Sequence, residues 1–413
     1  FINGTFSNLS QGQMVTLSYN GVSYNFVANY FSGSGNDLVL VWANNRAYAW
    51  GLNSSGELGN NSTTAYRTAG PVTSTGVLEG RTIIALAAGG HHSLALCSDG
   101  TLAAWGANTF GEVGDNTTVQ RLTPVAVNAV NGVSALYGKT VVAISAGHRH
   151  AMALCSDGTV VAWGDNSNGG GLGDNSLEQR NAPVAVYTGA SSALLGKTVA
   201  RIVASQDMSM ALCTDGTVAT WGLNLSGQLG IGSTSSKQAP VRVNTGSYSA
   251  LNGKTVVSIA AAGYNARAFC SDGTLVSWGD NAVGQLGNNL PFQSDLPSLV
   301  DTTPLHAGER VIRPSRGDVD VQMLALVAEP EQSVTTLAAT TVGGTGATLN
   351  GTVDPNDGIA VAVSFDYGTT TAYGTIFTPG YASITSATST PVESLATGLL
   401  PNTTYHYRLS VRD

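Results

Sequence analysis

The stretch CSDGTVVAWG, residues 155–164, decides the fold, because the chain repeats it three more times with few changes. CSDGTLAAWG stands at 97–106, CTDGTVATWG at 213–222 and CSDGTLVSWG at 270–279. With the earlier Trp-Gly pair at Trp50, successive tryptophans of this pattern lie 55, 58, 58 and 57 residues apart. Repetition at such a period indicates a structure assembled from equal units.

Each unit contains the pattern of four short strands. The segments on either side of the Ser-Asp-Gly or Thr-Asp-Gly turn alternate and are rich in residues that favour strands, which predicts a hairpin. A G-x-[LV]-G motif begins six or seven residues after each Trp, and a further strand-like run such as GKTVVAISAG (Gly138–Gly147) precedes the next hairpin. Four-stranded units repeated at this length predict the blades of a β-propeller, whose radial arrangement protects the strand edges.

The Trp-Gly and G-x-L-G frame, with its Ser-Asp-Gly turn, resembles the regulator-of-chromosome-condensation repeat family over roughly residues 40–330. The acidic charge and the β-rich flanking segments are similar to the bacterial secreted branch of this family. We therefore predict an all-β chain with a β-propeller at residues 43–330, built from five repeats of about 57 residues. Six blades remain possible, because either DLVLVW (Asp37–Trp42) or MLALVA (Met323–Ala328) could complete a closing blade.

Two smaller β modules are predicted to flank the propeller. Residues 1–42 contain three strand-like runs joined by Asn20-Gly21 and by SGSGND, and they resemble a short module of bacterial autotransporter-like surface proteins. Residues 331–413 resemble a fibronectin type III domain, an Ig-like sandwich, in which six strands can be placed and the last strand is missing. The residues that carry this resemblance are Gly398, Leu399, Pro401, Thr403, Tyr405, Tyr407 and Arg408.

Composition excludes several classes of function. The 413 residues carry 18 Lys and Arg against 26 Asp and Glu, a net charge of −8, and only 11% are charged, against roughly 25% in typical soluble domains. The acidic balance argues against a nucleic acid partner, which needs clustered Lys and Arg. No apolar stretch approaches the ~18 residues of a membrane span. We expect a secreted protein located outside the cell or at the cell surface.

The recurring polar residues are predicted to be structural. The four cysteines lie at one equivalent place in successive units, which separates them too far for disulfides and predicts small buried side chains. The aspartates of the four turns are expected to hold those turns, the five repeat tryptophans to lie in blade cores, and His92 and His150 to bond adjacent-blade backbone. No catalytic, cofactor or metal site is predicted, so we do not expect an enzyme. The residues concerned are Cys97, Cys155, Cys213 and Cys270, and Asp99, Asp157, Asp215 and Asp272.

The leading functional prediction is a non-catalytic structural protein, a segment or repeating subunit of a bacterial surface fibre or adhesin. In its sharper form, the N-terminal strand of one copy fills the missing-strand groove of the next sandwich, so that copies of the chain join head to tail. Other surface proteins or glycans are the remaining expected partners. The candidate donor strand is Phe1, Ile2, Asn3, Gly4, Thr5 and Phe6.

The alternative is a secreted recognition module that binds a protein or a glycan through the loop face of the propeller. The variable loops that follow the G-x-L-G motifs would then supply the contacts. The candidate residues are Tyr66, Arg67, Gln120, Arg121, Gln179, Arg180, Lys237, Gln238, Phe292 and Gln293.

Overall fold

The computed structural model of the chain describes residues 8–32, 37–305, 310–314, 325–328, 333–354, 362–377, 384 and 389–412. These residues are all-β apart from one short 3-10 turn, η1 (Gly76–Leu78). The chain divides into two compact units. The first contains residues 1–301 and 314–324, and the second contains residues 302–313 and 325–413.

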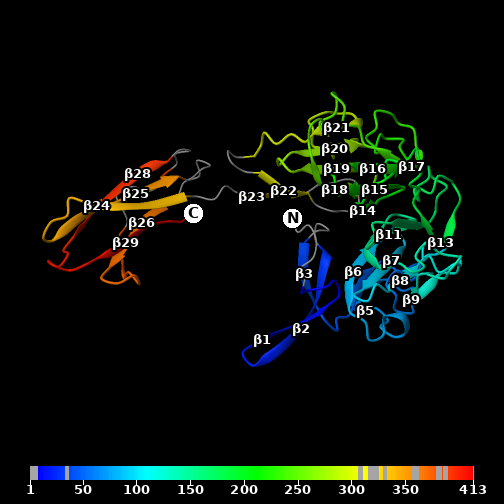
Figure 1. Cartoon of the computed structure of the whole chain (residues 1–413), viewed down its shortest axis with the longest axis horizontal. Coiled ribbons are helices and arrows are strands. Elements are labelled where there is room, and N and C mark those ends of the chain that lie inside the picture. Colours follow the sequence, from blue (N-terminus) through cyan, green and yellow to red (C-terminus); the bar gives the residue numbers. More distant parts are fainter. Residues whose placement is uncertain are drawn as a thin grey trace. The chain divides into compact units, whose positions relative to one another are not determined.

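Four sheets of the first unit are complete blades, each made of four antiparallel strands that follow one another along the chain (Figure 1). This confirms the predicted all-β class and the four-stranded repeat. The strands are β6 (Ile83–Ala88), β7 (His92–Cys97), β8 (Leu102–Gly106) and β9 (Arg121–Ala126); β10 (Val141–Ala146), β11 (His150–Cys155), β12 (Val160–Gly164) and β13 (Arg180–Ala185); β14 (Val199–Ala204), β15 (Met208–Cys213), β16 (Val218–Gly222) and β17 (Lys237–Arg242); β18 (Val256–Ala262), β19 (Asn265–Cys270), β20 (Leu275–Gly279) and β21 (Ser294–Leu299).

The repeated ten-residue stretch forms the hairpin between the second and third strands of a blade. At the β11–β12 turn, Gly158 has a φ of +81°, a conformation that favours glycine. Asp157 accepts a hydrogen bond from the Thr159 N–H at 3.0 Å, as predicted. Lys139 Nζ, 2.5 Å from Asp157 Oδ2, holds the pKa of this carboxyl at about 2. The equivalent ion pairs are Arg81–Asp99, Lys197–Asp215 and Lys254–Asp272.

The indole of each blade is bonded to the blade before it. Trp163 Nε1 donates to the Glu112 carbonyl at 2.9 Å, and Glu112 is the variable residue of the preceding G-x-V-G motif. The second glycine of this motif lies against the ring, since a Cβ added to Gly114 would lie 2.7 Å from Trp163 Nε1. All four tryptophans bonded in this way are at most 2% exposed. The other three bonds are Trp105 to Glu57, Trp221 to Gly171 and Trp278 to Gln228.

Apolar side chains fill the space between neighbouring blades. Met152 and Leu154 of β11, for example, share one buried cluster with Ala211 and Cys213 of β15. The predicted role of the cysteines is confirmed, because all four are buried and free, and burial raises the pKa of each thiol to about 11.

The first repeat is incomplete in the described part of the chain. It supplies β4 (Tyr48–Gly51) and β5 (Tyr66–Pro71), which pair only with each other there. Trp50 is 64% exposed, so the prediction that it lies in a blade core is wrong for the described structure. DLVLVW forms β3 (Asp37–Trp42) and pairs with β2 rather than with β4. MLALVA lies partly outside the described residues, and the number of blades stays a prediction.

The N-terminal strands form a sheet that packs on the propeller. β1 (Met14–Tyr19), β2 (Val22–Ser32) and β3 form an antiparallel meander, and Asn20 and Gly21 turn the first hairpin with φ of +49° and +76°. Val27 of β2 is 2% exposed and joins the cluster that contains Ile84 of β6.

The second unit contains two three-stranded sheets around one core. Val353, Phe365 and Leu409 are the centre of that core. Tyr405 accepts a hydrogen bond at its hydroxyl from the Leu400 N–H at 3.1 Å, an arrangement typical of Ig-like sandwiches. The fibronectin type III assignment stays a prediction. The sheets are β24 (Ser333–Thr340), β25 (Gly346–Asp354) and β28 (Thr390–Thr397), and β26 (Ala362–Gly368), β27 (Thr375–Phe377) and β29 (His406–Arg412). This unit also holds the pair β22 (Arg310–Pro314) and β23 (Ala325–Ala328), except for Pro314.

Candidate functional site

An asparagine in every repeat fixes the loop between the third and fourth strands. Asn224 is fully buried; its Oδ1 accepts from the Leu229 N–H at 2.8 Å, and its Nδ2 donates to the carbonyls of Ser233 and Ser235. This role was not predicted, although an Asn stands three residues after every repeat Trp. The equivalent residues are Asn53, Asn108, Asn166 and Asn281.

Two positions that vary from repeat to repeat lie side by side in each blade. The residue before the second strand accepts, at its backbone carbonyl, a hydrogen bond from the N–H of the residue after the third strand. Arg149 and Asp165 form such a pair at 2.9 Å. The other pairs are His91 with Ala107, Asp207 with Leu223, and Tyr264 with Asp280. We call these eight residues the variable face.

Two residues of this face, His91 and Arg149, contact aromatic groups beside it. The ring of His148 lies 5.7 Å from the ring of His91, whose Nδ1 is 3.3 Å from Glu57 Oε1. The Arg149 guanidinium lies 5.0 Å from the centre of the Phe110 ring. The side chains of His91 and Arg149 are 44% and 41% exposed. Aromatic and arginine side chains of this kind are enriched in protein interfaces.

Buried carboxylates lie on and beside the face. The Asp165 side chain is 5% exposed, and its Oδ2 lies 3.9 Å from Arg149 Nη1. Burial raises the pKa of Asp207, and the nearby Asp165 adds to the rise. Burial also raises the pKa of Glu112, which accepts a hydrogen bond from the Phe110 N–H at 2.8 Å.

Exposed apolar side chains follow two residues of the variable face along the chain, Leu223 and Asp280. Leu225 and Val283, in the loops after β16 and β20, are 71% and 65% exposed. A surface that mixes exposed apolar groups with a few charges is typical of a binding surface.

Two buried histidines begin the second strands directly after His91 and Arg149. His150 Nε2 lies 2.9 Å from Ser209 Oγ, which donates to the Gly171 carbonyl at 2.8 Å. The predicted bond from His150 to adjacent-blade backbone is therefore wrong, since a side chain is its partner. Neither ring nitrogen of His92 has a hydrogen-bond partner in the described residues, so the predicted backbone bond is wrong for His92 as well. Burial lowers the pKa of His92 to about 3 and that of His150 to about 4.

The loop residues predicted as contacts lie at or just before the start of the fourth strand of their repeats. Arg121 and Arg180 pair with Asp115 and Asp174 at 2.6 and 2.8 Å, which binds them into their own loops. Phe292 is 77% exposed. A contact role for this set stays a prediction. The set comprises Tyr66, Arg67, Gln120, Arg121, Gln179, Arg180, Lys237, Gln238, Phe292 and Gln293. The candidate donor strand, Phe1–Phe6, lies outside the described residues.

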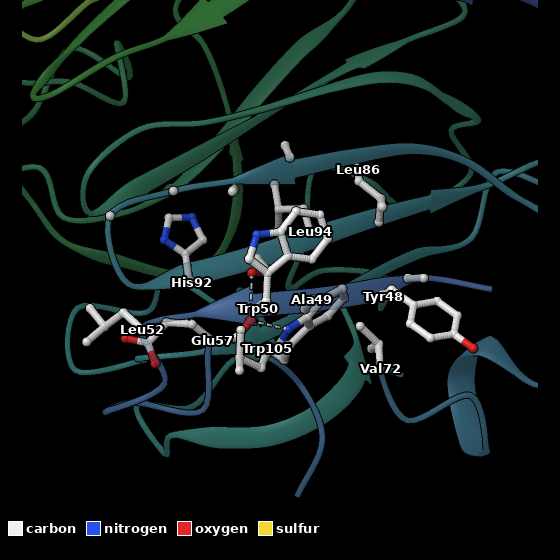
Figure 2. Close-up of a pocket in the computed structure, with 17 residues that line it drawn as sticks. Tyr48, Ala49, Trp50, Leu52, Glu57, Val72, Leu86, His92, Leu94 and Trp105 are labelled. Atoms are coloured by element: carbon white, nitrogen blue, oxygen red, sulfur yellow. Dashed lines mark hydrogen bonds between the residues drawn. The ribbon is translucent and has the colours of Figure 1, made fainter. Parts of the chain in front are cut away.

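A 420 Å³ cavity lies beside β4 (Figure 2). Figure 2 shows Trp50, Leu94 and Trp105 at this cavity, with Trp105 bonded to Glu57. Strands β6 and β7 line its other side. In the complete blades, the second strand of the preceding blade packs against the second strand of the next, as β11 does against β15. β4 and β5 are the only described strands of the first repeat, so no such strand packs against β7 among the described residues. The cavity thus marks the incomplete blade, and we assign no ligand to it.

The described residues show neither a metal site nor a membrane-spanning helix. The described ranges contain no group of three or more His, Cys, Asp or Glu side chains arranged to hold a metal ion. Among them we also find no helix with the length and apolar character needed to span a membrane.

The repeat frame agrees with a known family. The family model described as the RCC1-like domain matches residues 13–342, most of the chain. The protein therefore belongs to the RCC1-like domain family of β-propellers.

The sequence is similar to parts of longer curated proteins. The human probable E3 ubiquitin-protein ligase HERC6 is 32% identical over 273 residues, 65% of this chain and 25% of the ligase. The ultraviolet-B receptor UVR8 of Arabidopsis thaliana is 28% identical over 54% of this chain and 47% of the receptor. The chain spans less than half of each curated relative it matches here, so the ligase activity in a relative's name gives no activity to this chain.

Solved structures support the fold. Human WBSCR16 superposes with a TM-score of 0.57 at 19% identity, covering 71% of this chain and 70% of the other. Prp20p from Saccharomyces cerevisiae superposes with a TM-score of 0.51 at 22% identity, covering 74% and 65%.

The main functional prediction is wrong. The relatives are HERC ligases and an ultraviolet-B receptor rather than subunits of fibres or adhesins, and the alternative of a recognition module fits them better. Mixed β modules without a catalytic motif suggested a fibre, but that pattern equally suits an interaction propeller. The bacterial secreted origin and the cell-surface location stay predictions.

Proposed function

We propose that the chain is a recognition module that binds a partner protein through the variable face of its propeller. One observation carries this proposal: the face changes its chemistry from blade to blade while the frame around it stays constant. Before the second strand stand His91, Arg149, Asp207 and Tyr264 in turn, whereas each following hairpin keeps its Cys, Asp-Gly and Trp-Gly residues. Positions with only a structural role would be expected to keep the same residue type in every repeat.

A protein partner is favoured over a glycan by the composition of the face. The stacked arginine, the paired imidazoles and the exposed Leu225 and Val283 resemble the aromatic, arginine and apolar content of protein interfaces. Family membership supports the same class of function.

The experiment compares two surfaces of the propeller. The face variant carries Arg149→Ala and Tyr264→Ala, and the rim control carries Arg67→Ala and Phe292→Ala. The wild type and both variants are tagged and used to capture partner proteins from an extract of the cells in which this protein is naturally produced. Binding of each captured protein to the wild type and to the two variants is then measured with purified components.

We expect the face variant to lose at least one partner that the wild type and the rim control both bind. A partner lost only from the rim control would place binding on the predicted loops and overturn the proposed face. Absence of any protein bound specifically by the wild type would overturn the recognition function.

A further inference from the structure

Four of the G-x-[LV]-G motifs each hold the indole of the next blade. The carbonyl of the second residue accepts a hydrogen bond from the indole N–H at 2.8–2.9 Å. A Cβ added to the last glycine would lie 2.5–2.8 Å from the indole nitrogen, and one added to the first glycine would lie 2.5–2.6 Å from the fourth strand of the next blade. Both glycines are buried in all four motifs. Each motif is therefore a site shaped for an indole ring.

The motif of the last complete blade has the same pattern of residues without an indole. None of the described residues lies within 4 Å of a Cβ added to Gly284, and only Val300, at 3.4 Å, lies within that distance of one added to Gly287. Both glycines are exposed. In the described part of the chain, no donor bonds the Gln285 carbonyl. We call Gly284, Gln285, Leu286 and Gly287 the open indole site.

The chain's own tryptophans lie elsewhere in the structure. Of the six, four are bonded to the other motifs. The ring of Trp42 packs on the rings of Tyr24 and Phe26, at 5.7 and 4.7 Å between ring centres. Trp50 lies at the cavity beside β4 (Figure 2). The open indole site is therefore accessible to an occupant from outside the chain.

The open indole site is bonded to the variable face. Gln285 Nε2 donates to Oδ2 of Asp280, a residue of that face, at 2.9 Å. Val283 and Leu290, which flank the site in the sequence, are 65% and 57% exposed. An accessible site with apolar neighbours and one unused acceptor suits a large ring that carries a single N–H donor.

We infer that the open indole site binds a tryptophan side chain of the partner protein. The inference rests on the proposed function and names the chemistry of its partner. A partner indole placed there donates to the Gln285 carbonyl and lies on Gly287, as the internal indoles do at the other four motifs. Tryptophan is enriched among the residues that dominate protein interfaces.

The first test measures whether the site is open in the chain alone. Gly287→Asn places a Cβ where the indole would lie, and Asn is among the residues that tolerate its φ of +60°. The matched control is Gly230→Asn, at a φ of +66°, whose Cβ would lie 2.7 Å from Trp278 Nε1. In chemical denaturation we expect Gly230→Asn to lower the unfolding midpoint several-fold more than Gly287→Asn. Equal losses would show that the chain already fills the site, and the inference would be wrong.

The second test uses a defined indole. N-acetyltryptophan amide is titrated into the full chain while the backbone amide resonances of the glycines are followed by ¹⁵N NMR. We expect the Gly284 and Gly287 resonances to move several-fold more than those of a filled motif. The filled motif is Gly227 and Gly230, which holds Trp278. The 1-methyl analogue lacks the N–H donor and should bind about fivefold more weakly. Equal movement of all four resonances, or movement of none, would overturn the inference.

Trp50 of the first repeat is the competing occupant. In the Gly287→Asn variant, the indole N–H resonance of Trp50 should stay where it is in the wild type, because Trp50 lies at the cavity beside β4. A displaced Trp50 resonance would assign the open indole site to the chain itself rather than to a partner.

The proposed function and the open indole site fail in different ways. If Gly287→Asn keeps every partner that the Arg149→Ala, Tyr264→Ala variant loses, the partner indole is wrong and the recognition function stands. If a partner is lost from Gly287→Asn but stays bound to the Arg149→Ala, Tyr264→Ala variant, the indole site stands and the proposed face is wrong.

Discussion

Ala151→Ser is expected to stabilise the propeller by giving His92 a hydrogen-bond partner, which it lacks among the described residues. At the next blade interface, Ser209 pairs across the hairpin with Trp221, accepts from His150 and donates to the Gly171 carbonyl. Ala151 is the equivalent residue, because it pairs across its own hairpin with Trp163. A serine hydroxyl there is placed to donate to the Glu112 carbonyl and to accept from His92 Nε2–H.

The expected gain is small and has a definite sign. One buried hydrogen bond contributes about 1 kcal/mol net, and leaving a buried donor unsatisfied costs about 1–3 kcal/mol. Ala151 is fully buried, so the added oxygen also meets close packing, which offsets part of the gain. We expect a net rise in the free energy of unfolding of roughly 0.5–1.5 kcal/mol.

Chemical denaturation at pH 7.5 with the reciprocal variant Ser209→Ala as the control tests this reasoning. That control removes the partner of His150 and should lower the free energy of unfolding by about 1–3 kcal/mol. If Ala151→Ser destabilises the protein while Ser209→Ala leaves it unchanged, the hydrogen-bond argument is refuted and packing alone decides the interface.

The remaining predictions concern pH, the loop asparagine and the indole bonds. The folded pKa values of His92 and His150, about 3 and about 4, lie below the ordinary 6.5. The stability that depends on their neutral forms is therefore complete above pH 6.5 and is lost as the pH falls toward the folded values, at a cost of about 2 kcal/mol for each histidine at pH 5. Denaturation across pH 5–8 checks this, and a flat profile would contradict it. Asn224→Ala removes three hydrogen bonds from a fully buried site and should lower the free energy of unfolding by roughly 2–4 kcal/mol. Hydrogen exchange in the loop at 233–238 should become faster, and unchanged exchange would show that the loop keeps its structure without these bonds. Trp221→Phe should lower the free energy of unfolding by about 1–3 kcal/mol, because it loses the bond to the Gly171 carbonyl. Trp50→Phe, at a side chain that is 64% exposed, should change it by less than about 0.5 kcal/mol in the same denaturation assay. Equal losses would mean that Trp50 is bonded as the other tryptophans are.

The frame of the propeller was predictable because its causes lie within one repeat. Hairpin turns depend on residues a few positions apart, and strand alternation is visible in ten residues such as 155–164. The burial of the cysteines followed from the same alternation. The Lys139–Asp157 ion pair spans 18 residues and recurs in four repeats, so it too was within reach, but the aspartate had already been explained by its turn.

Contacts between repeats were harder to predict, since their partners are separated by a full period. The bond from Trp163 to Glu112 joins residues 51 positions apart, and nothing in either segment alone signals it. Trp50 shows the reverse failure: its sequence matches the other repeats, yet its environment depends on a preceding strand that the described structure does not place beside it.

The variable face was not predicted for a related reason. Loop variability drew attention to the start of the fourth strands, where Arg121 and Arg180 turn out to neutralise Asp115 and Asp174 of their own loops. Variation within a repeat protein has two sources, tolerance and selection, and residue lists alone do not separate them. Contacts help to separate them: Arg121 and Arg180 pair with carboxylates of their own repeats, whereas Arg149 lies over Phe110 of the preceding repeat. A variable side chain that lies between repeats and keeps 41% of its surface exposed, as Arg149 does, is available to a partner, which is why we seek the recognition function at the variable face.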